Sequence, residues 1–184
     1  MIYIIILIAI ATRFIPHMPN LAPITALAIF SAVYLPKKQA IAVPLLARFA
    51  SDLIIGFFAW PLMVAVYASH LAGVGIGLWI KRSPEGTGKR WLKIGSAGLF
   101  SAGVFFLVTN FVMFYPGSYP QSWAGLVASY TNALPFLRGT IMGDVGYTVA
   151  LFGGYSLAVY LAKNFSYKRL KSKTNQIISS FIGS

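Results

Sequence analysis

The sequence has 184 residues, of which 58% are hydrophobic and only 10% are charged, with fifteen basic and three acidic side chains. About a quarter of the residues of an ordinary soluble domain are charged, so this composition argues against a water-soluble core. The formal net charge of +12 would suggest nucleic-acid binding in a soluble chain. Here the basic residues fall between long apolar runs, as membrane topology requires, which excludes nucleic acid as the expected partner. The absence of cysteine excludes disulfides, thiolate metal sites and cysteine nucleophiles.

The apolar runs predict an all-α integral membrane protein with about six transmembrane helices. We expect a single transmembrane domain over residues 1–184, with a helical bundle in residues 1–162 and a basic cytoplasmic tail in residues 163–184. Ala9-Ile10-Ala11 offers a site like those cleaved after signal peptides, but no Lys or Arg precedes the first run, so we interpret that run as a retained helix. The six runs comprise residues 2–15, 21–35, 40–59, 62–80, 91–114 and 140–162.

The first two runs are short for a membrane crossing. Each reaches only about 21 to 23 Å as a helix, whereas the hydrocarbon core is roughly 30 Å thick. We therefore expect the connection over residues 16–20 to lie below the membrane surface, buried in protein or lining a wet cavity. Whether residues 1–15 and 21–35 form two separate full crossings stays open at this point.

A proline-rich segment separates the fifth run from the sixth. Residues 115–137 contain Pro116, Pro120 and Pro135 around an uncharged stretch, residues 122–134, of helical character. Because that stretch is too short to span the hydrocarbon core, it predicts a short interfacial or re-entrant helix between the fifth and sixth transmembrane helices.

The basic residues predict the orientation. Twelve of the fifteen lie at alternate ends of the runs, and the opposite ends have none. These twelve are Lys37, Lys38, Lys81, Arg82, Lys89, Arg90, Lys93, Lys163, Lys168, Arg169, Lys171 and Lys173. The positive-inside rule then places both termini in the cytoplasm.

The remaining arginines and most of the acidic residues lie within or beside the apolar runs, where ionisable groups are costly and usually functional. From the predicted depths, they converge with other polar and aromatic side chains on the outer half of the protein, as in an outward-open site for a small solute. The candidate site residues are Arg13, His17, Asn20, Arg48, Asp52, His70, Asn110, Tyr130, Asn132, Arg138, Asp144 and Tyr147.

Each of these candidates also has a structural explanation. Arg48 and Asp52 are four residues apart on one helix, so they can neutralise each other's charge. His70 fits an interhelical hydrogen bond at least as well as a ligand contact. The aromatic residues are also typical of an interfacial belt.

Small residues recur at helical spacing and allow helices to approach closely. Gly73, Gly75 and Gly77 resemble a nucleotide-binding loop only superficially, because no strand precedes them, and we interpret them as a packing face. The pairs Gly139 with Gly143, Ala22 with Ala26, and Ala28 with Ala32 have the same character. The alanine pairs are also candidates for docking a partner subunit.

Several strings of this sequence resemble an uncharacterised family of small bacterial membrane proteins, which is itself similar to the substrate-binding S components of energy-coupling-factor transporters. The strings are residues 13–23 (RFIPHMPNLAP), Pro44-Leu45-Leu46, Ser51-Asp52-Leu53, residues 105–111 (FFLVTNF), Ala133-Leu134-Pro135-Phe136 and Gly143-Asp144. The resemblance implies a six-helix bundle that binds a vitamin or metal ion and works with a transmembrane T subunit and two ATPases. The first run, however, lacks the Ala-x-x-x-Ala face with which S components dock to the T subunit.

The leading expectation is therefore a membrane subunit that binds a small vitamin-like solute for uptake, embedded in the lipid bilayer and without a cofactor. A transition metal is an alternative solute, with His17, His70 and Asp52 as ligands. A structural or assembly subunit of a larger membrane complex is another. We do not expect an enzyme, because the sequence shows no activated nucleophile, although a His and Asp pair could act as acid and base.

Overall fold

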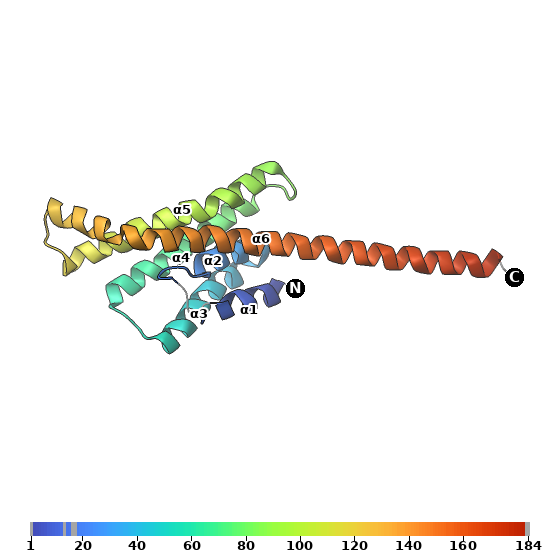
Figure 1. Ribbon diagram of the computed structural model, residues 1–184, viewed down its shortest axis with the longest axis horizontal. Helices are drawn as coiled ribbons and strands as arrows, with labels where there is room; N and C mark the ends of the chain where they lie inside the picture. Colours follow the sequence, from blue (N-terminus) through green and yellow to red (C-terminus); the bar gives the residue numbers. More distant parts are fainter. Residues whose placement is uncertain (1, 13, 16–17, 183–184) are drawn as a thin grey trace.

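The computed structural model describes residues 2–12, 14–15 and 18–182. The secondary-structure elements of this part of the chain are all helices, without strands (Figure 1). The elements are α1 (Ile2–Thr12), α2 (Ile24–Tyr34), α3 (Lys37–Ile55), α4 (Trp60–Lys81), α5 (Gly88–Met113), a π-helical turn η1 (Phe114–Ser118) and α6 (Trp123–Ile182). The expected all-α fold with six helices is confirmed for the described residues.

Three helices are long and apolar enough to cross a membrane: α4, α5 and the part of α6 from Trp123 to Phe165. Helix α3 has 19 residues but carries four charged side chains. Helices α1 and α2 have 11 residues each, which is about 16 Å of helix against a hydrocarbon core of roughly 30 Å. The chain thus has the character of a helical membrane protein, with two short apolar helices beside the long ones.

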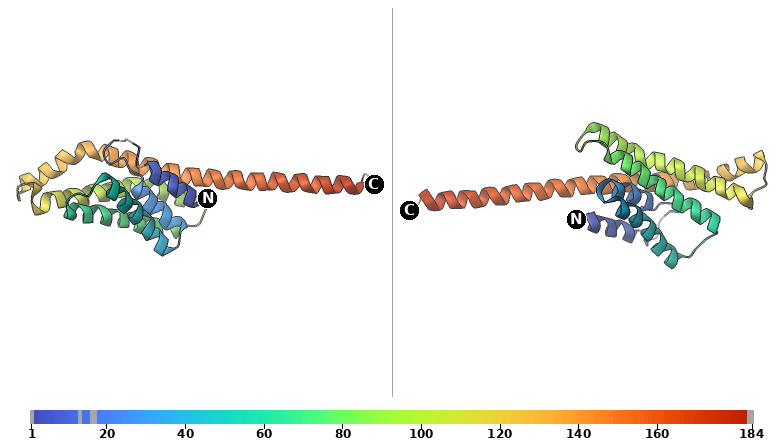
Figure 2. Two further views of the ribbon diagram at one scale, coloured as in Figure 1. Left: turned by 90° about the horizontal axis from the view of Figure 1, so that it is seen from below. Right: turned by 180° about the vertical axis from the view of Figure 1, so that it is seen from behind.

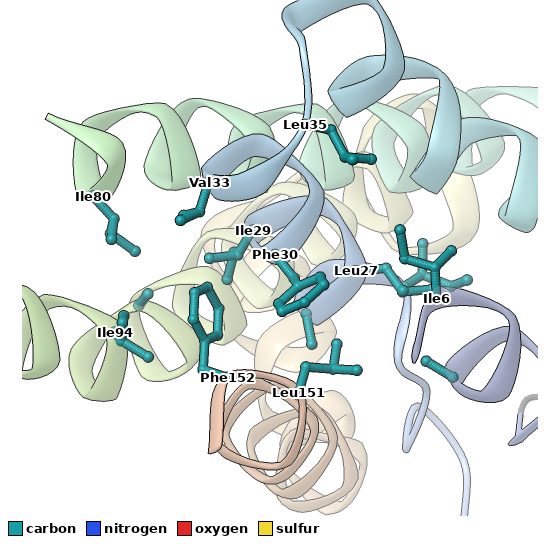
Figure 3. Packing of buried hydrophobic residues seen from close by; sticks show 14 of the residues in the cluster. Ile6, Leu27, Ile29, Phe30, Val33, Leu35, Ile80, Ile94, Leu151 and Phe152 are labelled. Atoms are coloured by element: carbon teal, nitrogen blue, oxygen red, sulfur yellow. The ribbon is translucent and has the colours of Figure 1, made fainter. Parts of the chain in front are cut away.

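Helix α2 forms the centre of the bundle, with α3, α4 and α6 packed around it (Figures 1 and 2). Every residue from Ile24 to Val33 is buried. Phe30 of α2 meets Phe152 of α6 edge to face, with ring centroids 5.3 Å apart. Ile80 of α4 and Ile94 of α5 belong to the same core (Figure 3). The sequence of α2 is apolar on all sides, without an amphipathic face, and a helix of this kind is expected to be buried all round.

The close approach of α4 to α2 depends on two glycines. A Cβ atom at Gly77 would lie 2.5 Å from the carbonyl oxygen of Ile29 and 2.6 Å from Cβ of Ala32. A Cβ atom at Gly73 would lie 3.3 Å from Cβ of Ala28. The interpretation of this glycine segment as a helix-packing face is therefore confirmed for Gly73 and Gly77.

The expected short helix between the fifth and sixth transmembrane helices is wrong as a separate element. Residues 123–134 form the first turns of α6, which continues without a break through Pro135 to Ile182. A proline removes one helical hydrogen bond and bends a helix, and the first part of α6, amber in Figure 2, is bent relative to the rest. Ending the helix at this apolar position would leave several backbone groups unpaired in lipid, which costs more than a bend.

The segment expected to be a basic tail continues the same helix. Helix α6 has 60 residues, or about 90 Å, and its last part extends beyond the bundle (Figure 1). The C-terminus, the α4–α5 connection and the start of α3 lie at one end of the molecule, here called the basic end. The η1 turn and the α3–α4 connection lie at the opposite end (Figure 1).

Candidate functional site

Two adjoining cavities lie between the helices, towards the end opposite the basic end. The first has a volume of about 310 Å³ and the second of about 220 Å³. Asn20, Arg48, Phe105 and Thr140 line both, so we describe them together as the polar cavity. Its remaining lining residues are Ala22, Thr25, Ile55, Phe58, Leu62, Val66, His70, Phe106, Thr109, Asn110, Met113, Ala133, Phe136, Leu137 and Asp144.

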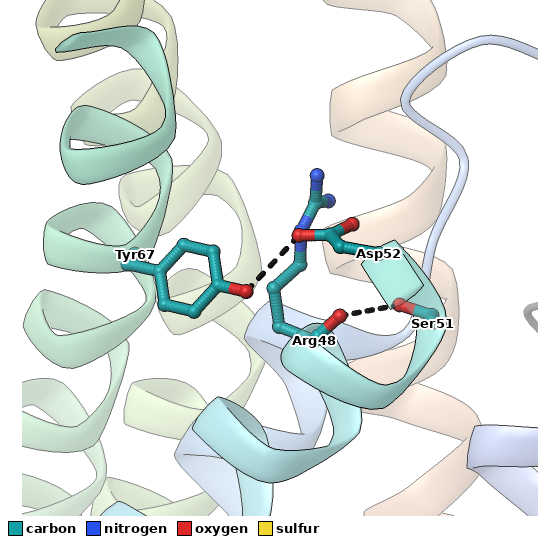
Figure 4. Close-up of polar contacts among 4 residues, drawn as sticks. All are labelled: Arg48, Ser51, Asp52 and Tyr67. Carbon is teal, nitrogen blue, oxygen red and sulfur yellow. Dashed lines mark hydrogen bonds and ion pairs between the residues drawn. The ribbon is translucent and has the colours of Figure 1, made fainter. Parts of the chain in front are cut away.

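Arg48 is the basic side chain among the described residues that line the polar cavity. Its Nε donates to Oδ2 of Asp52 at 2.8 Å, and the hydroxyl group of Tyr67 on α4 donates to the same oxygen at 3.1 Å (Figure 4). The Asp52 side chain is 2% exposed and that of Arg48 is 15% exposed. The expected pairing of these residues one helical turn apart is therefore confirmed, and Tyr67 adds a contact between α3 and α4.

The pairing uses only one of the three guanidinium nitrogens of Arg48. In Figure 4 the guanidinium end extends beyond the Asp52 carboxylate. Neither Nη1 nor Nη2 donates a hydrogen bond to another residue that the structure describes. The ring of Phe58 packs over the group, with its centroid 5.3 Å from Cζ. Arg48 is thus held in position, with two donor groups that no described residue accepts.

Thr25, in the first turn of α2, connects three helices at the floor of the cavity. Its hydroxyl oxygen lies 3.3 Å from Nδ1 of His70 on α4, and its side chain also interacts with the carboxyl group of Asp144 on α6. The His70 ring stacks on Phe105 of α5, with centroids 6.1 Å apart. The expectation of an interhelical hydrogen bond for His70 is confirmed, and His70 also lines the cavity.

Asp144 is a buried carboxyl group, 3% exposed, beside the N-terminus of α2. Its Oδ2 atom has no hydrogen-bond partner among the residues that the structure describes. The α2 terminus has no side-chain cap either. The first N–H groups of a helix carry partial positive charge, so this terminus and Asp144 favour each other electrostatically. A solute donor that reaches Oδ2 would satisfy the remaining acceptor.

Asn20 reaches the cavity through an unusual backbone conformation. Its φ angle is +62°, in the left-handed region that asparagine tolerates better than most residues. The chain beside it lies against α6: a Cβ atom at Gly143 would be 3.0 Å from the backbone nitrogen of Ala22, and one at Gly139 would clash with the carbonyl oxygen of Pro19. Gly139 and Gly143 therefore admit a loop, and not a helix as the spacing suggested.

The end of this loop lies deep among the helices. Thr25 meets His70, which lies about midway along α4 between Trp60 and Lys81. The connection into α2 therefore ends halfway along a helix long enough to span a membrane. Backbone at such a depth is tolerated where it is buried or lines a cavity, as Asn20 does here.

The structure brings together five of the predicted site residues at the cavity wall: Asn20, Arg48, His70, Asn110 and Asp144. A sixth, Asp52, acts behind Arg48. Asn110 donates from Nδ2 to the carbonyl oxygen of Phe106 at 2.7 Å, which fixes its amide at the cavity wall. The predicted residues Arg13 and His17 lie outside the described residues.

Four predicted residues lie elsewhere. Arg138 and Asn132 are exposed and line neither part of the polar cavity. The hydroxyl group of Tyr130 donates to the carbonyl oxygen of Leu107 at 2.9 Å, and Tyr147 packs against the hydrophobic core. These residues were expected at the site because their depth is right, but depth does not say which face of α6 they occupy.

The alanine pairs that were expected to dock a partner subunit are mostly buried within the protein, so this expectation is wrong. Ala26, Ala28 and Ala32 are 0% exposed, because the central position of α2 covers them with neighbouring helices. Ala22 is partly buried, close to Gly143. These alanines allow close packing within the protein and are not available to a second protein.

Sequence analysis missed the hydroxyl groups and most of the aromatic walls. Thr25, Thr109 and Thr140 line the cavity, together with Phe58, Phe105 and Phe136. Tyr67 could have been found, since it lies on the same helix as His70 and one turn away from it. The threonines carry no such signal, because a threonine in an apolar helix is common.

The described residues contain no group of three or more His, Cys, Asp or Glu side chains arranged to hold a metal ion.

Fold and site together are those of an all-helical membrane-type protein with a polar cavity between its helices. The sequence model of a family described as "Family of unknown function (DUF6580)" matches residues 1–168, so the chain belongs to that family. Comparisons with curated proteins and with solved structures found no match.

Proposed function

We propose that this protein binds a small solute with an anionic group in the polar cavity and takes part in its uptake across a membrane. The observation that carries the proposal is the position of Arg48. Its Nε is fixed to Asp52, its two Nη groups bond to no other residue that the structure describes, and its side chain lines both parts of the cavity. An ionised guanidinium group held in place binds a carboxylate or phosphate through two parallel hydrogen bonds.

The walls of the cavity suit a solute with an apolar or aromatic body. Phe58, Phe105 and Phe136 provide aromatic surface near Arg48, and Asn110 and Thr109 provide a few polar contacts. Small-molecule sites are commonly mostly apolar, with a small number of polar groups that fix orientation. A volume of about 310 Å³ is at the lower end of such sites, which favours a compact molecule of vitamin size.

The floor of the cavity offers a second point of recognition. Asp144 has a free acceptor there, and the Thr25 hydroxyl group is close to it. A solute with an anionic group towards Arg48 and a hydrogen-bond donor towards Asp144 would meet complementary groups at both. Ionisable groups at this depth in a membrane protein are typical of substrate pathways.

If the family is related to the S components of energy-coupling-factor transporters, as the sequence strings suggested, the proposal extends to uptake in a bacterial inner membrane, with both termini in the cytoplasm. On this hypothesis a T subunit and two ATPases supply the energy. Because Ala26, Ala28 and Ala32 are buried, such partners would dock on another surface. A protein that works alone is the other form of the same proposal.

A transition metal as the solute receives less support. His70 bonds to Thr25, Asp52 is held by Arg48 and Tyr67, and the described residues contain no group of three or more His, Cys, Asp or Glu side chains that could hold a metal ion. Elemental analysis of purified protein tests this alternative. A stoichiometric metal that is lost in His70→Gln would favour it.

The main test compares two arginine variants. The protein and its Arg48→Gln and Arg138→Gln variants are purified in lipid nanodiscs, and bound small molecules are extracted and identified by mass spectrometry. We expect the wild type and Arg138→Gln to retain the same anionic compound, and Arg48→Gln to lose it. Retention by all three, or a compound without an anionic group, would contradict the proposal.

A further inference from the structure

A hydrophobic groove lies between α4 and α5, separate from the polar cavity. Its volume is about 520 Å³, and it is lined by Ala72, Gly75, Ile76, Trp79, Ser96, Ala97 and Phe100. The lining of α4 from Ala72 to Trp79 covers seven helical steps, or about 10 Å along the helix. All of these side chains are apolar except Ser96, so the groove suits a stretch of hydrocarbon.

The groove opens away from the centre of the protein. Gly73 and Gly77 point towards α2, and at about 100° per residue Gly75 lies on nearly the opposite side of α4. A Cβ atom at Gly75 would meet nothing within 4 Å. The groove therefore faces outward, and on a helix that spans a membrane this direction is occupied by lipid.

Large aromatic residues form the rims, and small residues form the floor. Trp79 is 49% exposed and Phe100 is 64% exposed, while Gly75 and Ala72 leave the depression between them. An empty apolar depression loses dispersion contacts along its whole surface. A single flexible acyl chain can follow such a depression between two aromatic rims.

A lysine marks the end of the groove nearest the basic end. Nζ of Lys93 lies 3.9 Å from the centroid of the Trp79 ring, and the carbonyl oxygen of Lys93 accepts a hydrogen bond from the Ser96 hydroxyl group at 3.2 Å. Two of the neighbouring cations have partners of their own: Lys81 donates to the carbonyl oxygen of Leu35, and Arg90 pairs with Glu85. Lys93 contacts the Trp79 ring, which lines the groove, and is therefore the cation that we assign to it.

We propose that this groove binds a phospholipid with an anionic headgroup. One acyl chain lies along Gly75 between Trp79 and Phe100, and the phosphate lies against Lys93, within reach of Ser96. Basic residues at a membrane surface attract anionic lipids, and the basic end is the one that the positive-inside rule assigns to the cytoplasm. This site is independent of the solute proposed for the polar cavity.

The test measures lipid retention by native mass spectrometry. The purified protein is mixed with equal amounts of phosphatidylglycerol and phosphatidylcholine, and the bound lipids are counted for wild type, Lys93→Gln and Gly75→Leu. Two matched controls are Lys89→Gln, an exposed lysine outside the groove, and Gly95→Leu, a glycine of α5 with open space around its Cβ position. Gel filtration and circular dichroism verify that each variant is folded.

We expect the wild type and both controls to retain phosphatidylglycerol preferentially. Lys93→Gln lowers this preference about fivefold, which corresponds to the roughly 1 kcal/mol of one interfacial lysine. Gly75→Leu fills the groove and reduces retention of both lipids. If the Gly75→Leu protein does not fold, Ala72→Leu is measured in its place. Equal retention of the two lipids by wild type would overturn the proposal. So would a dimer in the wild type that Gly75→Leu abolishes, because the groove would then hold a second copy of the chain.

Discussion

Nδ1 of His70, midway along α4, lies 3.3 Å from the hydroxyl oxygen of Thr25 in the first turn of α2. The Thr25 side chain also interacts with Asp144 on α6. One small side chain thus joins three helices at the floor of the polar cavity. Because α2 is short and buried on all sides, such contacts and its packing decide where its N-terminus lies.

Replacing Thr25 with valine tests this connection. The side chain keeps its shape, but His70 and Asp144 lose their shared partner, so we expect the free energy of unfolding to fall by about 1 to 2 kcal/mol. Thermal unfolding in detergent measures the change. Thr131→Val is the matched control, since its exposed hydroxyl group bonds only within α6, to Val127. Equal losses in the two variants would show that the three-helix connection contributes nothing.

Two glycines of α4, Gly75 and Gly77, distinguish the effect of helix packing on stability from the effect of helix propensity. Gly77→Ala forces α4 away from the Ile29 carbonyl group and Ala32, so we expect a loss of about 1 to 3 kcal/mol in the free energy of unfolding. Gly75→Ala adds the same methyl group in open space, where alanine's higher helix propensity makes it neutral or slightly stabilising. Unfolding curves measured in one detergent compare them directly. A stable Gly77→Ala protein would contradict the close α2–α4 approach.

Because Arg48 and Asp52 form an ion pair, we expect a double substitution to recover much of the stability that a single substitution loses. Asp52→Leu leaves a largely buried positive charge without its partner, and we expect a loss of about 3 to 5 kcal/mol in the free energy of unfolding. Arg48→Met combined with Asp52→Leu removes both charges and restores much of that stability. A double-mutant cycle from unfolding measurements gives the coupling. Additive losses would argue against a direct interaction.

Filling the polar cavity tests whether it holds the solute. Ala133 lines the cavity, and Ala133→Phe occupies part of its volume. We expect the variant to lose the compound that the wild type retains, as detected by mass spectrometry of extracts. Leu134→Phe, at the next residue, is 53% exposed and serves as the control with unchanged retention. Loss in the control alone would place the binding site outside the cavity.

Hydropathy predicted the helices α4 and α5 to within three residues at each end. The predicted runs were residues 62–80 and 91–114, and the helices are Trp60–Lys81 and Gly88–Met113. The pairing of Arg48 with Asp52 was predictable too, because it depends only on helical spacing. Such features are local: they follow from residues a few positions apart, whatever the rest of the chain does.

Other features depend on contacts between distant segments. Pro135 looks like a boundary in the sequence, yet α6 passes through it, since lipid offers its backbone no other partner. Ala28 and Ala32 have the pattern of a docking face, and only the central position of α2 shows that α4 uses that face. Arg138 has a suitable depth for the site but is exposed.

By itself, the sequence determined that this is a membrane-type helical protein and that the costly polar groups Arg48, Asp52, His70 and Asp144 belong to its interior. Hydrocarbon tolerates few charges, so ionisable residues within apolar runs indicate groups that face the interior of the protein. Only the tertiary structure decided which of these groups share one cavity and that Thr25 joins two of them, His70 and Asp144. The direction of a side chain from a helix is set by how that helix packs, and packing is a property of several segments together.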